Sequence, residues 1–403
     1  MGKSFSNRGA TLKKILLISY YFEPCQAIGS KRWSELFSLF SNDKDYEITL
    51  LTANWEGKKV EQKNVNYIGD SIKFVPFKSI NRKFTFIDIL KHPSIFIRSL
   101  DRSIFQDQWY LNVKKWIDTN KDNEYDIVIA SYTPINAIRL GSYARKVFNS
   151  KYIVDMRDMM SLQGQKIQVP IIDFFDRLLD KYWLKDASFL LSVGPTICEK
   201  ALKFYKKDVH LLYNAFLEKD FTEKNIDIIG NKIVLSYMGT MGIKRNPRGL
   251  LELLNEYAKQ NNEIQIEVNF ASQDNPHEFI RDLEINSIKI NWLGYLSKEG
   301  IANLKAETNC FILLEDIDIK GKENVTGKVF EYMLEQKPVL AYCNQESDIK
   351  KILEYSTIGK IITDFDNLNL FMDLIINNQF MVNKNKILEF SREKQYQKLK
   401  GFL

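Results

Sequence analysis

Two glutamates, Glu323 and Glu331, stand on either side of a predicted helix start in the last third of the chain. Thr326 and Gly327 open that helix, and unpaired backbone N–H groups at a helix start bind anions such as a diphosphate. Glu331, one turn inside the helix, is placed to accept two hydroxyls of a ribose, and Glu323 is placed to reach a sugar hydroxyl. An ordinary pair of surface carboxylates beside a capped helix would show the same spacing.

A second phosphate-type pattern begins at Gly239 and Gly242, directly after the predicted strand 232–237. Glycines let a ligand approach the backbone, and the cations that follow, Lys244 and Arg245, could neutralise phosphate charge. This is a first strand-to-helix turn, where doubly wound folds bind nucleotide phosphates. The spacing is not G-x-G-x-x-G, so the dehydrogenase fingerprint is absent. A flexible turn with solvated cations is the alternative interpretation.

The first half of the chain has a similar turn after the predicted strand 14–20. Gly29 and Ser30 open a helix that also carries Arg32, which makes a third candidate anion site. Later in this half, Asp155, Arg157 and Asp158 end another strand, at the edge where open sheets bind ligands. A salt bridge of Arg157 with either aspartate explains these residues as well as a catalytic role does.

The sequence gives no support for a metal site. The triplets 316–318 and 364–366 have the D-x-D spacing of some metal–nucleotide sites, but one triplet supplies few ligands for a hard cation. The three histidines and four cysteines are scattered, without zinc-type spacing. We therefore predict no metal and no cofactor. The separated cysteines also favour a reducing compartment.

Most of these candidate residues follow predicted strands, so they form a site only in a fold that brings the ends of those strands together. Apolar strands alternate with helix-period segments, which is typical of parallel sheets covered on both faces, a doubly wound α/β fold. The 403 residues suffice for two or three domains. The pattern pauses at the polar stretch 214–231 and restarts at 232. We predict an N-terminal Rossmann-like domain at 1–220, a second Rossmann-like domain at 221–380, and a C-terminal helical segment at 381–403.

Composition excludes several classes of protein. With 45% hydrophobic residues the chain can bury large cores, and it has no apolar run long enough to span a membrane. A net charge of +6 is too small to indicate nucleic-acid binding. The segment 84–116 mixes aromatic and basic residues, as a face for anionic lipid does, but helices that pack their apolar sides inward explain it too. We predict a cytoplasmic protein with peripheral contact to the inner face of the cell membrane.

Together these motifs resemble family-4 glycosyltransferases. The similarity runs from E-P-x-x-x-x-G-S-x-R at 23–32, through D-x-R-D at 155–158, to E-x7-E at 323–331 and the Lys337-Pro338 pair, and so covers nearly the whole chain. It implies a GT-B fold, in which two Rossmann-like domains face a cleft and a C-terminal helix crosses back to the first. It also implies transfer with retention of anomeric configuration and without a metal.

Carried over by position, the resemblance makes Glu331 the ribose ligand and Glu323 the residue beside the transferred sugar. Lys244 or Arg245 would hold the diphosphate together with amides around Thr326 and Gly327, and Gly294 would lie near the base. The first domain, with Gly29, Ser30, Arg32 and Arg157, would bind the acceptor, and Asp158 would be a catalytic residue of the cleft. The chain departs from the family at Thr240, where many members have arginine, and around Asp158, where many have histidine.

The predicted function is therefore a glycosyltransferase that uses a UDP- or GDP-sugar and a glycan or lipid-linked acceptor in cell-envelope polysaccharide synthesis. A sugar-nucleotide epimerase of the same fold is an alternative enzyme. A non-catalytic nucleotide-sugar-binding subunit is a further alternative, although the intact glutamate pair argues against it.

Overall fold

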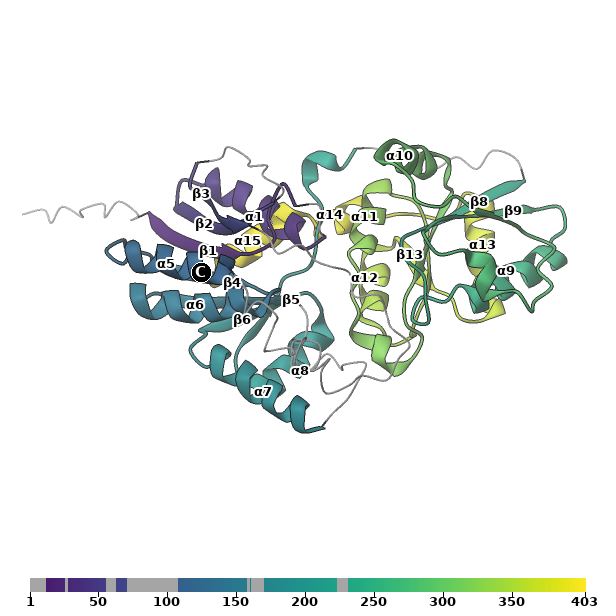
Figure 1. Ribbon diagram of the computed structural model, residues 1–403. Coiled ribbons are helices and arrows are strands. Elements are labelled where there is room, and N and C mark those ends of the chain that lie inside the picture. The colour runs from purple at the N-terminus through teal and green to yellow at the C-terminus, as the bar shows by residue number, and fades with distance from the viewer. Residues whose placement is uncertain are drawn as a thin grey trace, which may run out of the picture. The chain divides into compact units, whose positions relative to one another are not determined.

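The computed structural model describes residues 12–25, 28–55, 63–70, 108–157, 160, 170–222 and 231–403. The chain divides into two compact units, Met1–Leu212 and Tyr213–Leu403, which we call unit 1 and unit 2 (Figure 1). Among the helices in the described ranges, none combines the length and apolar composition needed to cross a bilayer.

Unit 1 contains a parallel sheet of 7 strands in the order β3-β2-β1-β4-β5-β6-β7. Its strands are β1 (Lys13–Ser19), β2 (Tyr46–Asn54), β3 (Val65–Asp70), β4 (Ile127–Ser131), β5 (Lys151–Arg157), β6 (Phe189–Ser192) and β7 (Val209–Leu211). Its helices are α1 (Ile28–Ser41), α5 (Gln108–Thr119), α6 (Ile135–Phe148), α7 (Pro170–Leu184) and α8 (Pro195–Tyr205). Helices α5 and α6 lie side by side (Figure 1) and bury Trp109, Val113 and Ile138 in the core.

Unit 2 contains a parallel sheet of 6 strands in the order β10-β9-β8-β11-β12-β13. Its strands are β8 (Lys232–Met238), β9 (Gln265–Ala271), β10 (Lys289–Trp292), β11 (Cys310–Leu314), β12 (Val339–Tyr342) and β13 (Gly359–Ile361). Its longer helices are α9 (Arg248–Gln260), α10 (Lys298–Glu307), α11 (Lys328–Glu335), α12 (Asp348–Ser356) and α13 (Phe365–Ile376).

The central strand β11 shows why the apolar runs form parallel sheets. Ile312 and Leu314 are buried in a cluster with residues of α9 and α13, and Phe311 and Leu313 in another with residues of α11 and α12. Because side chains alternate along a strand, a strand that packs on both faces must be apolar throughout. The doubly wound α/β fold predicted for each half is therefore confirmed.

Helices α14 (Lys384–Leu388) and α15 (Arg392–Phe402) replace the single helical segment expected after 381. Their junction is joined to the first residues of unit 2. The backbone N–H of Arg392 donates to the carbonyl of Phe216 (2.6 Å), and the Ser391 hydroxyl donates to Glu218 (2.7 Å). The crossing of this helix to the first domain stays a prediction.

Candidate functional site

The candidate site lies at the carboxyl edge of the unit 2 sheet. The strand order reverses between the neighbours β8 and β11, and ligands of open α/β sheets bind at the carboxyl ends of strands at such a switch point. Gly239 follows β8 and Glu315 follows β11, so both flank this point. A hydrogen bond fixes the turn after β8: the backbone N–H of Met241 donates to the Asp274 carboxylate (2.7 Å).

Arg245 and Glu315 form the ion pair of this edge. The Nε and Nη2 atoms of Arg245 both contact Oε1 of Glu315, at 3.1 and 2.9 Å. Glu315 is buried, whereas the Arg245 side chain is 35% exposed and so keeps a face toward solvent. Lys244 is 72% exposed and lies 4.0 Å from Asp316. Of the two predicted phosphate cations, Arg245 is therefore the one that the fold holds in place.

Lys328, the first residue of α11, adds a cation that the sequence interpretation missed. Its Nζ donates to the phenol oxygen of Tyr237 (3.1 Å) and lies 4.4 Å from the centre of that ring. The Tyr237 hydroxyl in turn donates to the carbonyl of Thr240 (2.6 Å). Gly239 makes room for the ammonium, because a Cβ at this position would overlap Nζ of Lys328. The absence of a side chain at Gly239 is thus a packing requirement.

The electrostatic balance around Lys328 favours an anion. Burial lowers the pKa of Lys328 from its ordinary 10.5 to about 8, and the nearby positive charge of Arg245 acts in the same direction. Glu315 and Glu331 act in the opposite direction, but Glu315 is already paired with Arg245 and Glu331 is exposed. Burial also raises the pKa of Tyr237, so the phenol remains neutral. One buried carboxylate therefore faces two cations.

The start of α11 leaves backbone donors beside this cluster. Gly327 is the residue before the helix and provides no side-chain cap, and the Thr326 hydroxyl is a distant acceptor, 3.5 Å from the N–H of Lys328. Glu331 lies exposed in the first turn, and Glu323 ends a short 3-10 helix, Ile319–Glu323, before the loop to α11. The fold thus brings Gly239, Arg245 and the predicted helix start to one edge. The roles assigned to Glu323 and Glu331 stay predictions.

Gly294 follows β10, on the other side of β9 from the cations. It adopts a left-handed backbone conformation (φ 65°), and its neighbours Trp292 and Tyr295 are exposed. The Trp292 indole N–H donates to the carbonyl of Ser272 at 2.8 Å, which fixes this ring on the edge of the sheet. A base-binding role for Gly294 stays a prediction.

The corresponding edge of unit 1 is built around Asp155, which is fully buried. Arg32 donates to both of its carboxylate oxygens (2.9 and 3.0 Å), and the Trp33 indole N–H donates to one of them (2.7 Å). A further Arg32 nitrogen donates to the carbonyl of Leu212 (2.9 Å). Arg32 is only 2% exposed, so its guanidinium joins α1, β5 and the segment after β7. Its predicted acceptor role remains untested.

The other predicted acceptor-side residues lie near this pair. Arg157 is 3.6 Å from Asp155, which is one of the two salt bridges expected as an alternative to catalysis. Its backbone is left-handed (φ 56°), a strained conformation that is enriched at functional sites. A Cβ on Gly29 would lie 2.9 Å from its Nη1, and the Ser30 hydroxyl donates to the carbonyl of Cys25 (2.7 Å). Asp158 and residues 84–107 lie outside the described residues.

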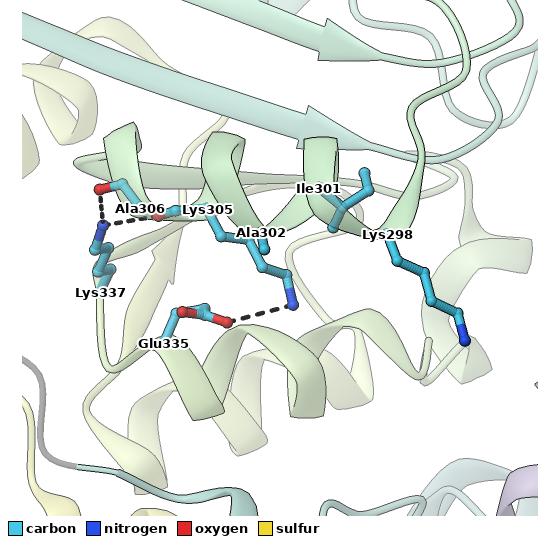
Figure 2. A pocket seen from close by; sticks show the side chains of 7 residues that line it. All are labelled: Lys298, Ile301, Ala302, Lys305, Ala306, Glu335 and Lys337. Carbon is cyan, nitrogen blue, oxygen red and sulfur yellow. Dashed lines mark hydrogen bonds and ion pairs between the residues drawn. The ribbon is translucent and has the colours of Figure 1, made fainter.

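Figure 2 shows a hollow that runs along α10 and faces the end of α11, with Lys298 at one end and Lys337 at the other. Its charged groups contact one another: Lys305 lies 3.3 Å from Glu335. Lys337 donates to the carbonyls of Lys305, Ala306 and Thr308 and thereby caps the end of α10. The charged side chains that line this hollow stabilise helix ends, and the hollow is not the candidate site.

The D-x-D triplets have structural partners. Asp316 accepts the N–H of Asp318 (3.2 Å), and Asp364 caps α13 by accepting the N–H of Asn367 (2.9 Å). Within the described ranges, no group of three or more His, Cys, Asp or Glu residues is suited to hold a metal ion. The predicted lack of a metal requirement stays a prediction.

Three residues of the site, Tyr237, Glu315 and Lys328, were missed at the level of sequence. Glu315 had a usable signal, since it directly follows the all-apolar strand Cys310–Leu314. Lys328 directly follows the glycine that opens α11. Tyr237 had no such signal, because it lies inside its strand and contacts Lys328 across 91 positions of sequence.

No protein-family profile matches the chain, and no curated protein sequence matches it. Solved structures do. The Rickettsia africae glycosyltransferase has a TM-score of 0.61 at 14% identity, over 97% of this chain and 98% of that one. The Anabaena protein HepE, crystallised with UDP and glucose, has a TM-score of 0.58 at 14% identity, over 97% and 99% of the two chains. A candidate UDP-N-acetylglucosamine 2-epimerase from Listeria monocytogenes has 0.51 at 13%, over 96% and 95%. The chain therefore shares the GT-B-type fold, with two Rossmann-like domains.

Proposed function

We propose that this chain is a family-4-type glycosyltransferase, which transfers a sugar from a nucleotide-sugar to a glycan or lipid-linked acceptor with retention of configuration. The observation that carries the proposal is the cation-rich edge of unit 2. Arg245 pairs with the buried Glu315, and Lys328 contacts the neutral phenol of Tyr237, at the start of a helix that has no side-chain cap. A diphosphate supplies the missing negative charge.

The same edge of the unit 2 sheet offers a place for each part of the donor nucleotide. The diphosphate binds at Arg245 and the start of α11, with Lys244 as the more mobile alternative cation, and Glu331 accepts the ribose hydroxyls. The base lies toward Gly294 at the end of β10. The Anabaena HepE structures with UDP and with UDP-glucose make UDP the first nucleotide to test and GDP the second.

The chemistry proposed for this site needs charge stabilisation at the leaving group. The bond between the anomeric carbon and the phosphate oxygen breaks, and the electron pair remains on the diphosphate. The acceptor hydroxyl forms the new bond on the same face and loses its proton to a base. Fixed cations stabilise the diphosphate as its charge grows, without reorganisation during the reaction. Glu323 orients the transferred sugar, and Asp158 belongs to the catalytic cleft on the acceptor side.

The test is a donor screen followed by product analysis. We expect UDP or a UDP-sugar to raise the thermal unfolding temperature, since a ligand that binds only the folded state stabilises it. Incubation of the stabilising donor with extracts of envelope lipids or glycans should then give a glycosylated product with the anomeric configuration of the donor. A chain that no UDP- or GDP-sugar stabilises would contradict the proposal.

A sugar-nucleotide epimerase is the second candidate, because the Listeria structure named above has the same fold. An epimerase changes the donor in the absence of an acceptor. Proton NMR of the donor incubated with the protein alone separates the two: a new stereoisomer indicates the epimerase, and an unchanged or slowly hydrolysed donor the transferase.

The proposed setting is cell-envelope polysaccharide synthesis at the inner face of the cell membrane, where a lipid-linked acceptor would be found. The aromatic and basic residues of 84–116, apart from the core residue Trp109, supply the contact with anionic lipid. We expect co-sedimentation with vesicles that contain phosphatidylglycerol, weakening as salt screens the charges. Absence of binding at low salt would contradict this contact and leave the transferase proposal standing.

A further inference from the structure

Lys328 has a different environment from the other lysines of the site. Its ammonium lies over the Tyr237 ring and donates to a neutral phenol, and it forms no ion pair with the described residues. A lysine whose charge is partly desolvated and not paired with a carboxylate is unfavourable in the free protein. An anionic ligand that pairs with the ammonium would remove this unfavourable state, so the arrangement is typical of an anion-binding site.

We propose that Lys328 is a phosphate-binding residue of the donor site, and that it takes the place of the arginine absent at Thr240. The inference rests on the proposed function. Three observations support it: Nζ occupies the space that Gly239 leaves open, Nζ donates to the Tyr237 hydroxyl, and the positive charge of Arg245 acts on it. The two cations therefore converge on the glycine turn, where a diphosphate approaches the backbone.

This position makes donor affinity depend on pH. The charged groups that act on Lys328 are Arg245, Glu315 and Glu331, and burial and Arg245 outweigh the two carboxylates, so its pKa is about 8 in the free protein. A bound diphosphate adds negative charge and raises that pKa. The protein then binds the donor in the protonated form, and above pH 8 binding must take up a proton.

The size of the effect follows from the fraction of Lys328 that is protonated. With a pKa of about 8 in the free protein and a higher one in the complex, affinity falls about tenfold between about pH 7 and about pH 9. At about pH 9 the uptake approaches one proton per bound nucleotide.

The experiment is calorimetric titration of the whole chain with UDP at both pH values, in two buffers that differ in ionisation enthalpy. Lys328→Met should bind UDP about ten- to a hundredfold more weakly at pH 7, with no proton uptake and a flat pH profile. Lys328→Arg, which stays charged, should also give a flat profile while it recovers part of the affinity. Lys259→Met, at an exposed lysine of α9, should behave as the parent.

The outcomes are distinguishable. If the parent binds neither UDP nor any UDP- or GDP-sugar, the proposed function and this inference both fail. If the parent binds UDP and Lys328→Met keeps its affinity or its pH dependence, only the inference fails. Uridine, which lacks phosphate, should bind the parent and Lys328→Met equally; a loss with uridine would show that Lys328 acts on the fold of the site and would overturn the inference.

Discussion

The two sheets of this protein have the same central topology and use it differently. When the strands of each sheet are numbered from 1 in chain order, both sheets contain the strand order 3-2-1-4-5-6. In each sheet the first strand is followed by a helix-opening glycine or by a glycine turn. In unit 1 the arginine near that turn, Arg32, is 2% exposed and bound to a buried carboxylate. In unit 2 the corresponding arginine, Arg245, is 35% exposed, and a second cation stands beside it.

Under the proposed function, the same fold serves stability in unit 1 and donor binding in unit 2. Asp155 accepts from Arg32 and Trp33 inside the protein, so this network joins elements that are distant in sequence. Glu315 pairs with Arg245 through one oxygen and leaves Lys328 to a neutral phenol. A buried and satisfied ion pair is structural, whereas a half-exposed cluster with excess positive charge favours an anionic ligand.

The largest effect is expected from breaking the unit 1 network. Asp155→Ala removes the shared acceptor of Arg32 and Trp33, and loss of one member of a buried ion pair costs about 3–5 kcal/mol. Five of the six tryptophans, all but Trp292, lie in unit 1, so tryptophan fluorescence in urea follows mainly this unit.

The matched control for this change is Asp118→Ala, which removes an exposed partner of Lys114 in unit 1. Exposed ion pairs contribute little, so its unfolding curve should stay close to that of the parent. Equal unfolding midpoints for Asp155→Ala and the parent would contradict the structural assignment of this network.

The next largest effect is expected on donor binding, from the carboxylate on α11. Glu331→Ala should weaken donor affinity ten- to a hundredfold, since a charged hydrogen bond contributes about 1.5–3 kcal/mol. Glu323→Gln should instead lower the single-turnover rate more than the affinity, because it acts where charge develops in the transition state. Donor titration and single-turnover kinetics measure the two effects.

Glu299→Ala is the control for these carboxylates. Glu299 lies exposed in the first turn of the neighbouring helix α10, so its loss has the same helix-dipole consequence without touching the proposed site. Parental affinity and rate in both Glu331→Ala and Glu323→Gln would show that these are surface carboxylates. Early melting of both would assign them a structural role.

A smaller effect is expected from the two glycines of the switch points. Gly239→Ala combines a left-handed backbone (φ 133°) with displacement of Lys328 and should weaken donor affinity about tenfold. Gly29→Ala meets only the end of the Arg157 side chain at 2.9 Å, and alanine favours a helix. Its unfolding temperature should therefore remain close to that of the parent. The reverse ranking of the two would contradict the contrast between the units.

Much of the fold could be predicted, because the strands are apolar on both faces. The predicted strands 14–20 and 232–237 differ from β1 and β8 by one residue at the ends that do not coincide. Helix α13 was not predicted: Asp364 and Asp366 were considered only as a D-x-D triplet, whereas Asp364 is the cap of that helix. A capping aspartate and a loop aspartate look alike until the apolar spacing after them is counted.

The candidate site was predictable only in part. Gly239, Arg245 and the start of α11 carry local signals of a phosphate site, and the fold brings them to one edge. The contacts that decide their roles join residues far apart in sequence, such as Arg32 with Asp155 and Lys328 with Tyr237. Sequence periodicity indicates which face of a helix or strand is buried. It does not indicate which charged side chain on another element will contact that face.

The smallest effect is expected from removing metal ions. If Arg245, Lys328 and the start of α11 neutralise the diphosphate, no divalent cation is needed, and turnover in EDTA should equal turnover without it. The Asp316–Asp318 triplet is a poor ligand set, since Asp316 already accepts the Asp318 N–H (3.2 Å) and lies 4.0 Å from Lys244. Loss of turnover in EDTA and its recovery with manganese would contradict this view. The cations of unit 2 would then bind a metal–diphosphate complex instead of replacing the metal. Unit 2 would still differ from unit 1 in its affinity for the donor, but not in neutralising the diphosphate by itself.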